Sequence, residues 1–279
     1  MISVLKEMFA YSFLVRAMVV GLLVSLCSSL LGVSLVLKRY SMIGDGLSHV
    51  GFGSLAVASA LNIAPLAVSV PVVVLAAFLL LRVSESRKIM GDASIALVST
   101  SSLAIGVAVI SLTTGMNTDV CNFLFGTILG LSKDDVKLSI VLAIIVLTLY
   151  GLFYNKIFAV TFDEAFAKAT GVQVWLYNML LAFLTAITIA LGMRMMGSLL
   201  ITSLIIFPPL TSMRLCKKFS SVTICSALLS VCCYFIGVVI SFVYAMPSGA
   251  SVVLVNIAAF LAFSAIQALP GRKAAEQQN

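Results

Sequence analysis

Residues Ala17–Leu37 read AMVVGLLVSLCSSLLGVSLVL, which is 21 consecutive residues without a charged side chain. A hydrocarbon core of about 30 Å is crossed by roughly 20 residues of α-helix, so this run is long enough to span a membrane. It is also longer than the apolar part of a secretory signal peptide, and it lacks a clear A-x-A cleavage pattern. We therefore expect a retained first transmembrane helix.

The composition extends this expectation to the whole chain. Of the 279 residues, 62% are hydrophobic and 10% are charged, whereas soluble domains carry about 25% charged residues. The length allows roughly eight to ten crossings joined by short loops. The sequence thus predicts an all-α fold, a polytopic transmembrane helical bundle of eight or nine spans that forms a single domain over residues 1–279. The expected spans are residues 13–37, 41–61, 65–81, 93–113, 136–153, 173–192, 195–213, 221–244 and 250–268.

The positive charge of the chain is placed between these spans. The formal net charge is +7, and lysine and arginine fall in short clusters such as Lys38-Arg39, Arg87-Lys88 and Lys217-Lys218. Clusters of this kind flank membrane helices on the cytoplasmic side. The pattern predicts an outside N-terminus and an inside C-terminus, in contact with the lipid bilayer and with no nucleic-acid partner.

One stretch between two spans mixes polar ends with a short apolar centre. Within residues 114–135 the apolar part is Val120–Leu131, and a helix of that length covers about 18 Å, too little to cross. We expect a surface helix or a re-entrant helix there.

A second stretch, Asn155–Gly171, is a predicted cytoplasmic loop with room for one short helix. Thr161 is a suitable N-cap, acidic residues follow in the first turn, and Gly171 would end the helix. Its apolar residues recur at i, i+3, i+4 and i+7 on one face. The helix is either a connector on the lipid surface or a docking helix for a cytoplasmic partner. The acidic pair is Asp163 and Glu164, and the apolar face comprises Phe162, Ala165, Phe166 and Ala169.

The chain has ten acidic residues and one histidine, and two of these eleven are Asp45 and His49 in the segment SMIGDGLSHVGFGSLAVASAL. On a helix their spacing puts them on one face, one turn apart. An aspartate inside a membrane costs about 2.5–3.5 kcal/mol, which favours a role on a substrate pathway. Carboxylate and imidazole also suit Zn²⁺ or Mn²⁺, and a two-fold dimer would supply two of each. The alternative is a hydrogen-bonded core pair.

Glycine and proline mark two of the spans. The glycines around Asp45 permit either a broken helix that lines a site or close helix packing. Pro208-Pro209 lies inside another span, where proline frees backbone carbonyls and kinks a helix. Nearby Ser and Thr side chains can line a path or bond to neighbouring helices. These glycines are Gly44, Gly46, Gly51 and Gly53, and the hydroxyl residues are Ser198, Thr202, Ser203, Thr211 and Ser212.

Several catalytic and cofactor patterns are missing from the sequence. There is no GxxxxGK[ST] loop for ATP phosphates, no GxSxG elbow and no HExxH pair. The six cysteines form no CxxC pair. We expect a transport subunit that is not itself an enzyme and binds no permanent cofactor.

Four segments together resemble the permease subunits of bacterial metal-uptake ABC transporters, the ABC-3 family. The likeness covers nearly the whole chain, although Gly46 and Val50–Gly53 stand where members often have Ala and Leu-Pro-Gly. It implies a type II importer permease in the bacterial cell membrane that works as a homodimer with cytoplasmic ATPase subunits and an extracytoplasmic metal-binding protein. The segments are RYSMIGDGLSHVGFGSLAVA (Arg39–Ala58), FDEAFAKATGV (Phe162–Val172), MGSLLITSLIIFPPLTSMRL (Met196–Leu215) and PSGASVVL (Pro247–Leu254).

The resemblance also implies roles for individual residues. Asp45 and His49 match the family's acid and histidine on the metal pathway. The loop 155–171 would hold the coupling helix that docks on the ATPase. Its coupling residues would be Phe162, Asp163, Glu164, Ala165, Lys168 and Gly171.

The function expected on these grounds is ATP-driven import of a divalent transition metal as the transported substrate. Zinc and manganese lead, with iron as a third candidate. Alternatives are a vitamin or siderophore permease of the same type and a proton-coupled secondary carrier in which Asp45 and His49 relay protons. An intramembrane enzyme is disfavoured because no second catalytic group accompanies Asp45.

Overall fold

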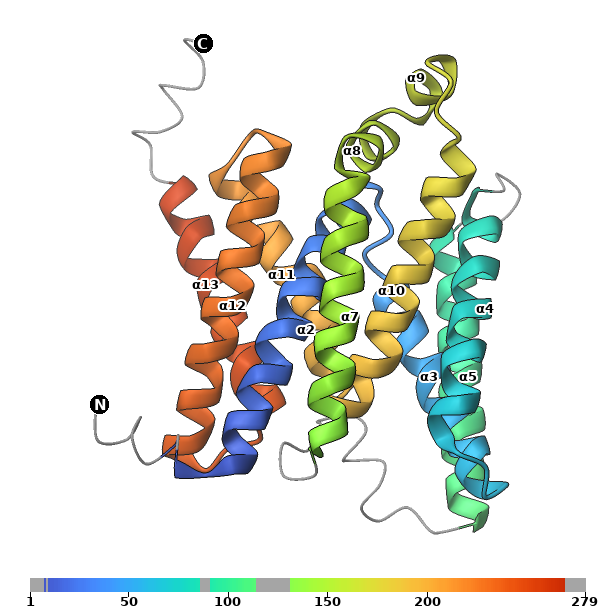
Figure 1. The fold of residues 1–279 in the computed structure, drawn as a ribbon, viewed down its shortest axis with the longest axis vertical. Coiled ribbons are helices and arrows are strands. Elements are labelled where there is room, and N and C mark those ends of the chain that lie inside the picture. The colour runs from blue at the N-terminus through green and yellow to red at the C-terminus, as the bar shows by residue number, and fades with distance from the viewer. Residues whose placement is uncertain (1–7, 9, 86–90, 114–130, 269–279) are drawn as a thin grey trace.

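The computed structural model describes residue 8 and residues 10–85, 91–113 and 131–268 of the chain. Regular structure in these residues is helical, and none of them forms a strand. The long helices run up and down along a common direction (Figure 1). They are α2 (Ser12–Leu37), α3 (Ile43–Ala60), α4 (Pro65–Glu85), α5 (Gly91–Thr113), α7 (Lys133–Leu152), α10 (Val174–Met196), α11 (Ser198–Leu215), α12 (Phe219–Tyr244) and α13 (Ser248–Ala268), and the short α8 (Tyr154–Phe162) and α9 (Glu164–Ala169) lie between α7 and α10.

Eight helices in the described part of the chain are long and apolar enough to cross a membrane. Helix α3 is not one of them, because Asp45, His49 and its glycines lower its hydropathy. Its 18 residues nevertheless extend about 27 Å at 1.5 Å per residue. The predicted all-helical bundle of eight or nine spans is confirmed.

Exposed apolar side chains on the outside of the bundle indicate that its surroundings are lipid. Large side chains on α5, α7 and α13 are more than half exposed, which is costly in water and favourable in lipid. The chain is therefore a multi-pass membrane protein. Examples are Leu97, Ile105, Leu112, Ile144, Leu254 and Leu261.

The helix boundaries follow the predicted spans to within a few residues, and α7 shows why one start was misplaced. It begins at Lys133, because Ser132 caps it in a reciprocal box. The Ser132 backbone N–H donates to Oδ2 of Asp135 at 2.9 Å, and the Asp135 N–H donates to the Ser132 hydroxyl at 3.2 Å. The polar residues 133–135, expected in a surface or re-entrant segment, thus belong to α7. Residues 131–132 precede α7, and residues 114–130 of that prediction lie outside the described residues.

Helix α2 is the most buried of the candidate spans, and hydroxyl groups bind it to α12. The hydroxyl of Ser230 donates to the Ser25 carbonyl at 2.9 Å, and that of Tyr234 donates to the Ala17 carbonyl at 3.0 Å. Four of the hydroxyl residues singled out on α11 donate their described hydrogen bonds to carbonyls of α11 itself. These bonds are not the predicted hydrogen bonds to neighbouring helices. These four are Thr202, Ser203, Thr211 and Ser212.

The Pro208-Pro209 pair lies inside α11, which continues as one helix to Leu215. Because neither proline has an N–H, the Ile205 carbonyl has no intrahelical donor at i+3 or i+4. Gly32 of α2 packs directly on that oxygen, and a Cβ at Gly32 would come within 2.1 Å of it. Such close contact allows a weak Cα–H···O interaction. The prolines therefore open a carbonyl against which α2 packs.

Candidate metal pathway and coupling segment

Helix α3 brings Asp45 and His49 to one face, as their spacing predicts. Asp45 lies in the first turn, where the positive end of the helix dipole stabilises a carboxylate. Nε2 of His49 lies 3.6 Å from Oδ2 of Asp45, too long for a direct hydrogen bond. The two groups lie within ion-pair distance but make no hydrogen bond to each other.

The bonding capacity of this pair is largely unused. The side chain of Asp45 is 40% exposed in the single chain, and that of His49 is 19% exposed. Nδ1 of His49 is buried and has no hydrogen-bond partner among the described residues. Leaving a buried polar atom unpaired costs about 1–3 kcal/mol. The arrangement differs from a hydrogen-bonded core pair, and the atoms that could share a ligand are Oδ2 of Asp45 and Nε2 of His49.

The glycines of α3 serve close packing. A Cβ on Gly46 would lie 2.8 Å from the Ile95 side chain, and one on Gly53 would lie 2.6 Å from the Ser102 carbonyl oxygen. Both contacts are with α5. Because α3 is continuous from Ile43 to Ala60, the alternative of a broken helix is wrong. Asp45 and His49 stand on a helix that is held tightly against its neighbour.

A complete metal site needs more ligands than this pair. The described residues contain no group of three or more His, Cys, Asp or Glu side chains that can hold an ion. Zinc normally takes four ligands in proteins. Among the described residues, Asp45 and His49 can therefore provide two ligands, which is half of such a set.

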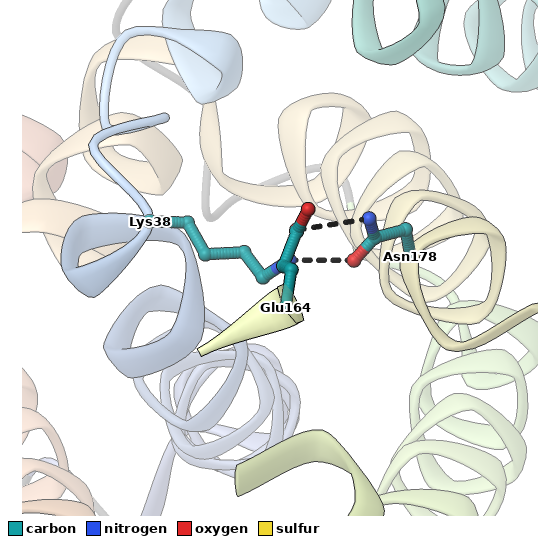
Figure 2. Close-up of polar contacts among 3 residues, drawn as sticks. All are labelled: Lys38, Glu164 and Asn178. Atoms are coloured by element: carbon teal, nitrogen blue, oxygen red, sulfur yellow. Dashed lines mark hydrogen bonds and ion pairs between the residues drawn. The ribbon is translucent and has the colours of Figure 1, made fainter. Parts of the chain in front are cut away.

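A second polar cluster lies where α2, α9 and α10 meet, as Figure 2 shows. Nζ of Lys38 donates to Oε1 of Glu164 at 2.6 Å and to Oδ1 of Asn178 at 2.5 Å. The amide nitrogen of Asn178 donates to the same Glu164 oxygen at 3.1 Å. The side chain of Lys38 is only 6% exposed, while that of Glu164 is 48% exposed. The cluster is a closed triangle of hydrogen bonds around a buried cation.

The environment of Glu164 keeps it ionised. Partial burial acts to raise its pKa, but the hydrogen bond and charge of Lys38, with a further bond from Asn178, outweigh burial and hold the pKa below 4.5. The sequence indicated Glu164 as a first-turn acid and, through the family resemblance, as a coupling residue, whereas it indicated Lys38 only as a charge flanking a span. Asn178 was missed, and its only signal was a polar residue near the start of an apolar run.

The predicted coupling segment contains two helices where one was expected. Asp163 has extended backbone dihedrals and separates α8 from α9. Oδ1 of Asp163 accepts the Phe166 N–H at 2.9 Å, so Asp163 caps α9 and the predicted cap Thr161 is wrong. Thr161 lies inside α8 and is buried. Gly171, which follows α9, has a φ of +82° that suits glycine, as predicted for its end.

The break at Asp163 divides the predicted apolar face. Phe162 ends α8, and its ring packs 5.9 Å from that of Phe219 at the start of α12. In α9, Ala165 and Ala169 are exposed and Phe166 is 64% exposed. Helix α9 thus presents a small apolar surface at the tip of the molecule (Figure 1).

A groove of about 860 Å³ runs beside α9. Glu164, Ala165 and Lys168 form one side, and the first turn of α10 forms the other. Lys168 is exposed in the last turn of α9. Most of the predicted coupling residues therefore gather at one protruding end. The groove is completed by Tyr40, Val172, Gln173, Val174, Trp175 and Leu176.

Comparisons with known proteins match nearly the whole chain. The sequence pattern of the ABC 3 transport family matches residues 10–267. A manganese transport system membrane protein of Listeria monocytogenes is 29% identical over 93% of this chain and 92% of its own length. A high-affinity zinc uptake system membrane protein of Haemophilus influenzae is 28% identical over 90% of this chain and 96% of its own. The solved structure of PsaBC from Streptococcus pneumoniae in complex with Fab has the same fold, with a TM-score of 0.85 and 24% identity over all of both chains.

Proposed function

Because the chain belongs to the ABC 3 transport family, we propose that it is the membrane permease of an ATP-driven importer of divalent transition metal ions, zinc or manganese. Relatives named for manganese and for zinc match it almost equally well. The family membership makes it a transport component. It is expected to work without enzymatic chemistry of its own.

The observation that carries the proposal is the Asp45–His49 pair. It offers one carboxylate and one imidazole on a continuous helix, with Nε2 of His49 3.6 Å from Oδ2 of Asp45. An ion that leaves water needs replacement ligands, and oxygen with imidazole nitrogen suits Zn²⁺ and Mn²⁺. The same incompleteness suits transport, because a pathway must bind weakly enough to release its ion. These properties fit a metal ion better than a bulky vitamin or siderophore.

A homodimer would complete the ligand set. Asp45 is 40% exposed in the single chain, so it is accessible to a second copy. A two-fold axis beside α3 would bring two carboxylates and two imidazoles around one ion, which matches four-coordinate zinc.

The partners follow from the position of α9. Its exposed surface around Ala165 and Phe166 would dock on a cytoplasmic ATPase subunit, and an extracytoplasmic metal-binding protein would deliver the ion at the opposite end. Nucleotide and the loaded binding protein would each favour a different conformation of the permease. Differences in affinity of this kind drive alternating access.

The test is metal uptake by the assembled complex. The permease, its ATPase and its binding protein are reconstituted in lipid vesicles, and radioactive Zn²⁺ or Mn²⁺ is supplied outside with excess unlabelled Zn²⁺, Mn²⁺ or Fe²⁺ as competitor. We expect uptake that requires ATP and is suppressed by the cognate metal, together with that metal in the purified complex. Uptake driven by a proton gradient without ATP would instead establish the secondary carrier.

A further inference from the structure

Lys38 is a buried cation in a place where burial is costly. Its side chain is 6% exposed, and an ammonium group removed from water must be paired to be tolerated. It lies at the C-cap of α2, where the negative end of the helix dipole also favours a cation. Its two short bonds to Glu164 and Asn178 complete the pairing.

Those bonds join three elements with different positions in the chain. Glu164 is the first residue of α9, the helix expected to touch the ATPase, and Asn178 lies near the start of α10. Lys38 belongs to the end of α2, the most buried candidate span. Any displacement of α9 would therefore act on a side chain held at the end of the most buried candidate span.

Lys38 and the Asp45–His49 pair are close in the sequence. Asp45 follows seven residues later, in the first turn of α3. A small cavity of about 10 Å³ next to the Lys38 side chain is lined by Ile43 and Leu47, which lie two residues before and two residues after Asp45 in the sequence, and by Leu81 of α4. The cluster and the start of α3 thus share one packed junction.

We propose that Lys38 is a positioning residue that links α9 to the metal pathway. Movement of α9 on the ATPase shifts Glu164, the Lys38 bond carries the shift to the connection between α2 and α3, and this moves Asp45 and His49 relative to their neighbours. Lys38 touches neither the ion nor the nucleotide. This inference rests on the proposed function and adds the route by which ATP hydrolysis reaches the ion.

The test measures two quantities on the same vesicles, ATP hydrolysed and metal imported. Lys38→Met keeps the unbranched stem and removes the charge. We expect hydrolysis to continue while metal imported per ATP falls at least about 5-fold, the lower end of the usual range for coupling between sites. Lys137→Met is the matched control, because Lys137 also pairs with a carboxylate, Asp134, but does so in an exposed position. Its ratio of metal to ATP is expected to stay at the wild-type value.

Two further variants keep the test decisive if Lys38→Met assembles poorly. Glu164→Gln removes the anion from a half-exposed position and should lower the ratio in the same direction. The reversed pair Lys38→Glu with Glu164→Lys restores an ion pair and should recover a larger ratio than either single reversal, since Asn178 can bond to both partners.

The outcomes separate this inference from the function on which it rests. If Lys38→Met, or Glu164→Gln in its place, imports as much metal per ATP as a working wild-type complex, the link is overturned and the function stands. A proportional loss of hydrolysis and uptake, with no recovery in the reversed pair, assigns Lys38 a purely structural role and also overturns it. A wild-type complex that hydrolyses ATP without importing metal overturns the proposed function itself.

Discussion

The Lys38 cluster and the Asp45–His49 pair are close in sequence and differ in how completely their polar atoms are bonded. Nζ of Lys38 makes two bonds of 2.6 Å or less, and Glu164 and Asn178 bond to each other as well. The pair on α3 has a 3.6 Å separation and an unpaired buried nitrogen. A polar cluster that is fully bonded fixes the elements that carry it. A polar cluster that is incompletely bonded can still bind a ligand and release it.

The largest effect is expected at the incompletely bonded pair. Asp45→Asn keeps the volume and removes the charge, and His49→Phe keeps a ring and removes both nitrogens. We expect each to lower metal uptake by at least about 10-fold, equivalent to about 1.4 kcal/mol, with yield, assembly of the proposed dimer and basal ATP hydrolysis better preserved. Yield, assembly and radiometal uptake are measured together on both variants.

A core pair predicts the reverse order for these variants. Yield and assembly would fall first, and whatever protein remained would import metal normally. Wild-type uptake per folded complex in both variants would show that Asp45 and His49 are not on the metal pathway. The functional difference between this pair and the Lys38 cluster would then no longer hold.

The next effect is expected on the exposed surface of α9. Glu164→Lys reverses the charge next to Lys38, and Ala165→Asp places a carboxylate on an exposed position of the proposed docking surface. We expect both to reduce metal uptake by several-fold, about 1 kcal/mol or more, while the chain still inserts in the membrane. Co-purification of the ATPase distinguishes them, since Ala165→Asp should weaken binding and Glu164→Lys should chiefly uncouple it. Normal uptake in both would make the segment a connector only.

The sequence was sufficient for features that depend on near neighbours. The apolar runs predicted the spans, and i, i+4 spacing predicted that Asp45 and His49 share a face. Helix starts were harder to predict, because more than one side chain nearby can serve as the cap. Asp163 caps α9 although Thr161 is equally suitable by type. The charged start of α7 is recognised as helical only once Ser132 is seen to cap it.

Contacts between distant segments could not be predicted. Lys38 and Asn178 are 140 residues apart, and no local pattern relates them. The same holds for Gly32 and Ile205: the Pro208-Pro209 pair indicates free carbonyls, but only the packed structure shows which glycine meets one. These contacts depend on tertiary packing, which composition and periodicity do not describe.

A smaller effect is expected where α2, which carries Lys38, packs on α11. In Gly32→Ala the new Cβ would lie 2.1 Å from the Ile205 carbonyl oxygen, so the helices must separate. Overpacking of this kind costs about 1–3 kcal/mol, and the midpoint of thermal unfolding in detergent should fall. Because the whole scaffold is affected, hydrolysis and uptake should decline together, unlike in Lys38→Met. Gly151→Ala is the control: a Cβ there meets nothing within 4 Å, and the helix propensity of alanine should leave stability unchanged or slightly higher.

The smallest effect concerns the pH dependence of the Lys38 cluster. The pKa of Glu164 is held below its ordinary value of 4.5, with burial opposed and outweighed by Lys38 and Asn178. A carboxyl whose pKa is lower in the folded protein stabilises it above the unfolded pKa, and the contribution is lost as pH falls through the folded pKa. The thermal midpoints of wild type and Glu164→Gln should therefore differ by a constant amount above pH 4.5 and converge below it. Asp134→Asn is the matched control, because the Asp134–Lys137 pair is exposed on both sides and such pairs contribute little. A Glu164→Gln difference that persists unchanged to about pH 3 would mean that the ionised carboxylate is not what stabilises the cluster, and the contrast with the pair on α3 would then rest on geometry alone.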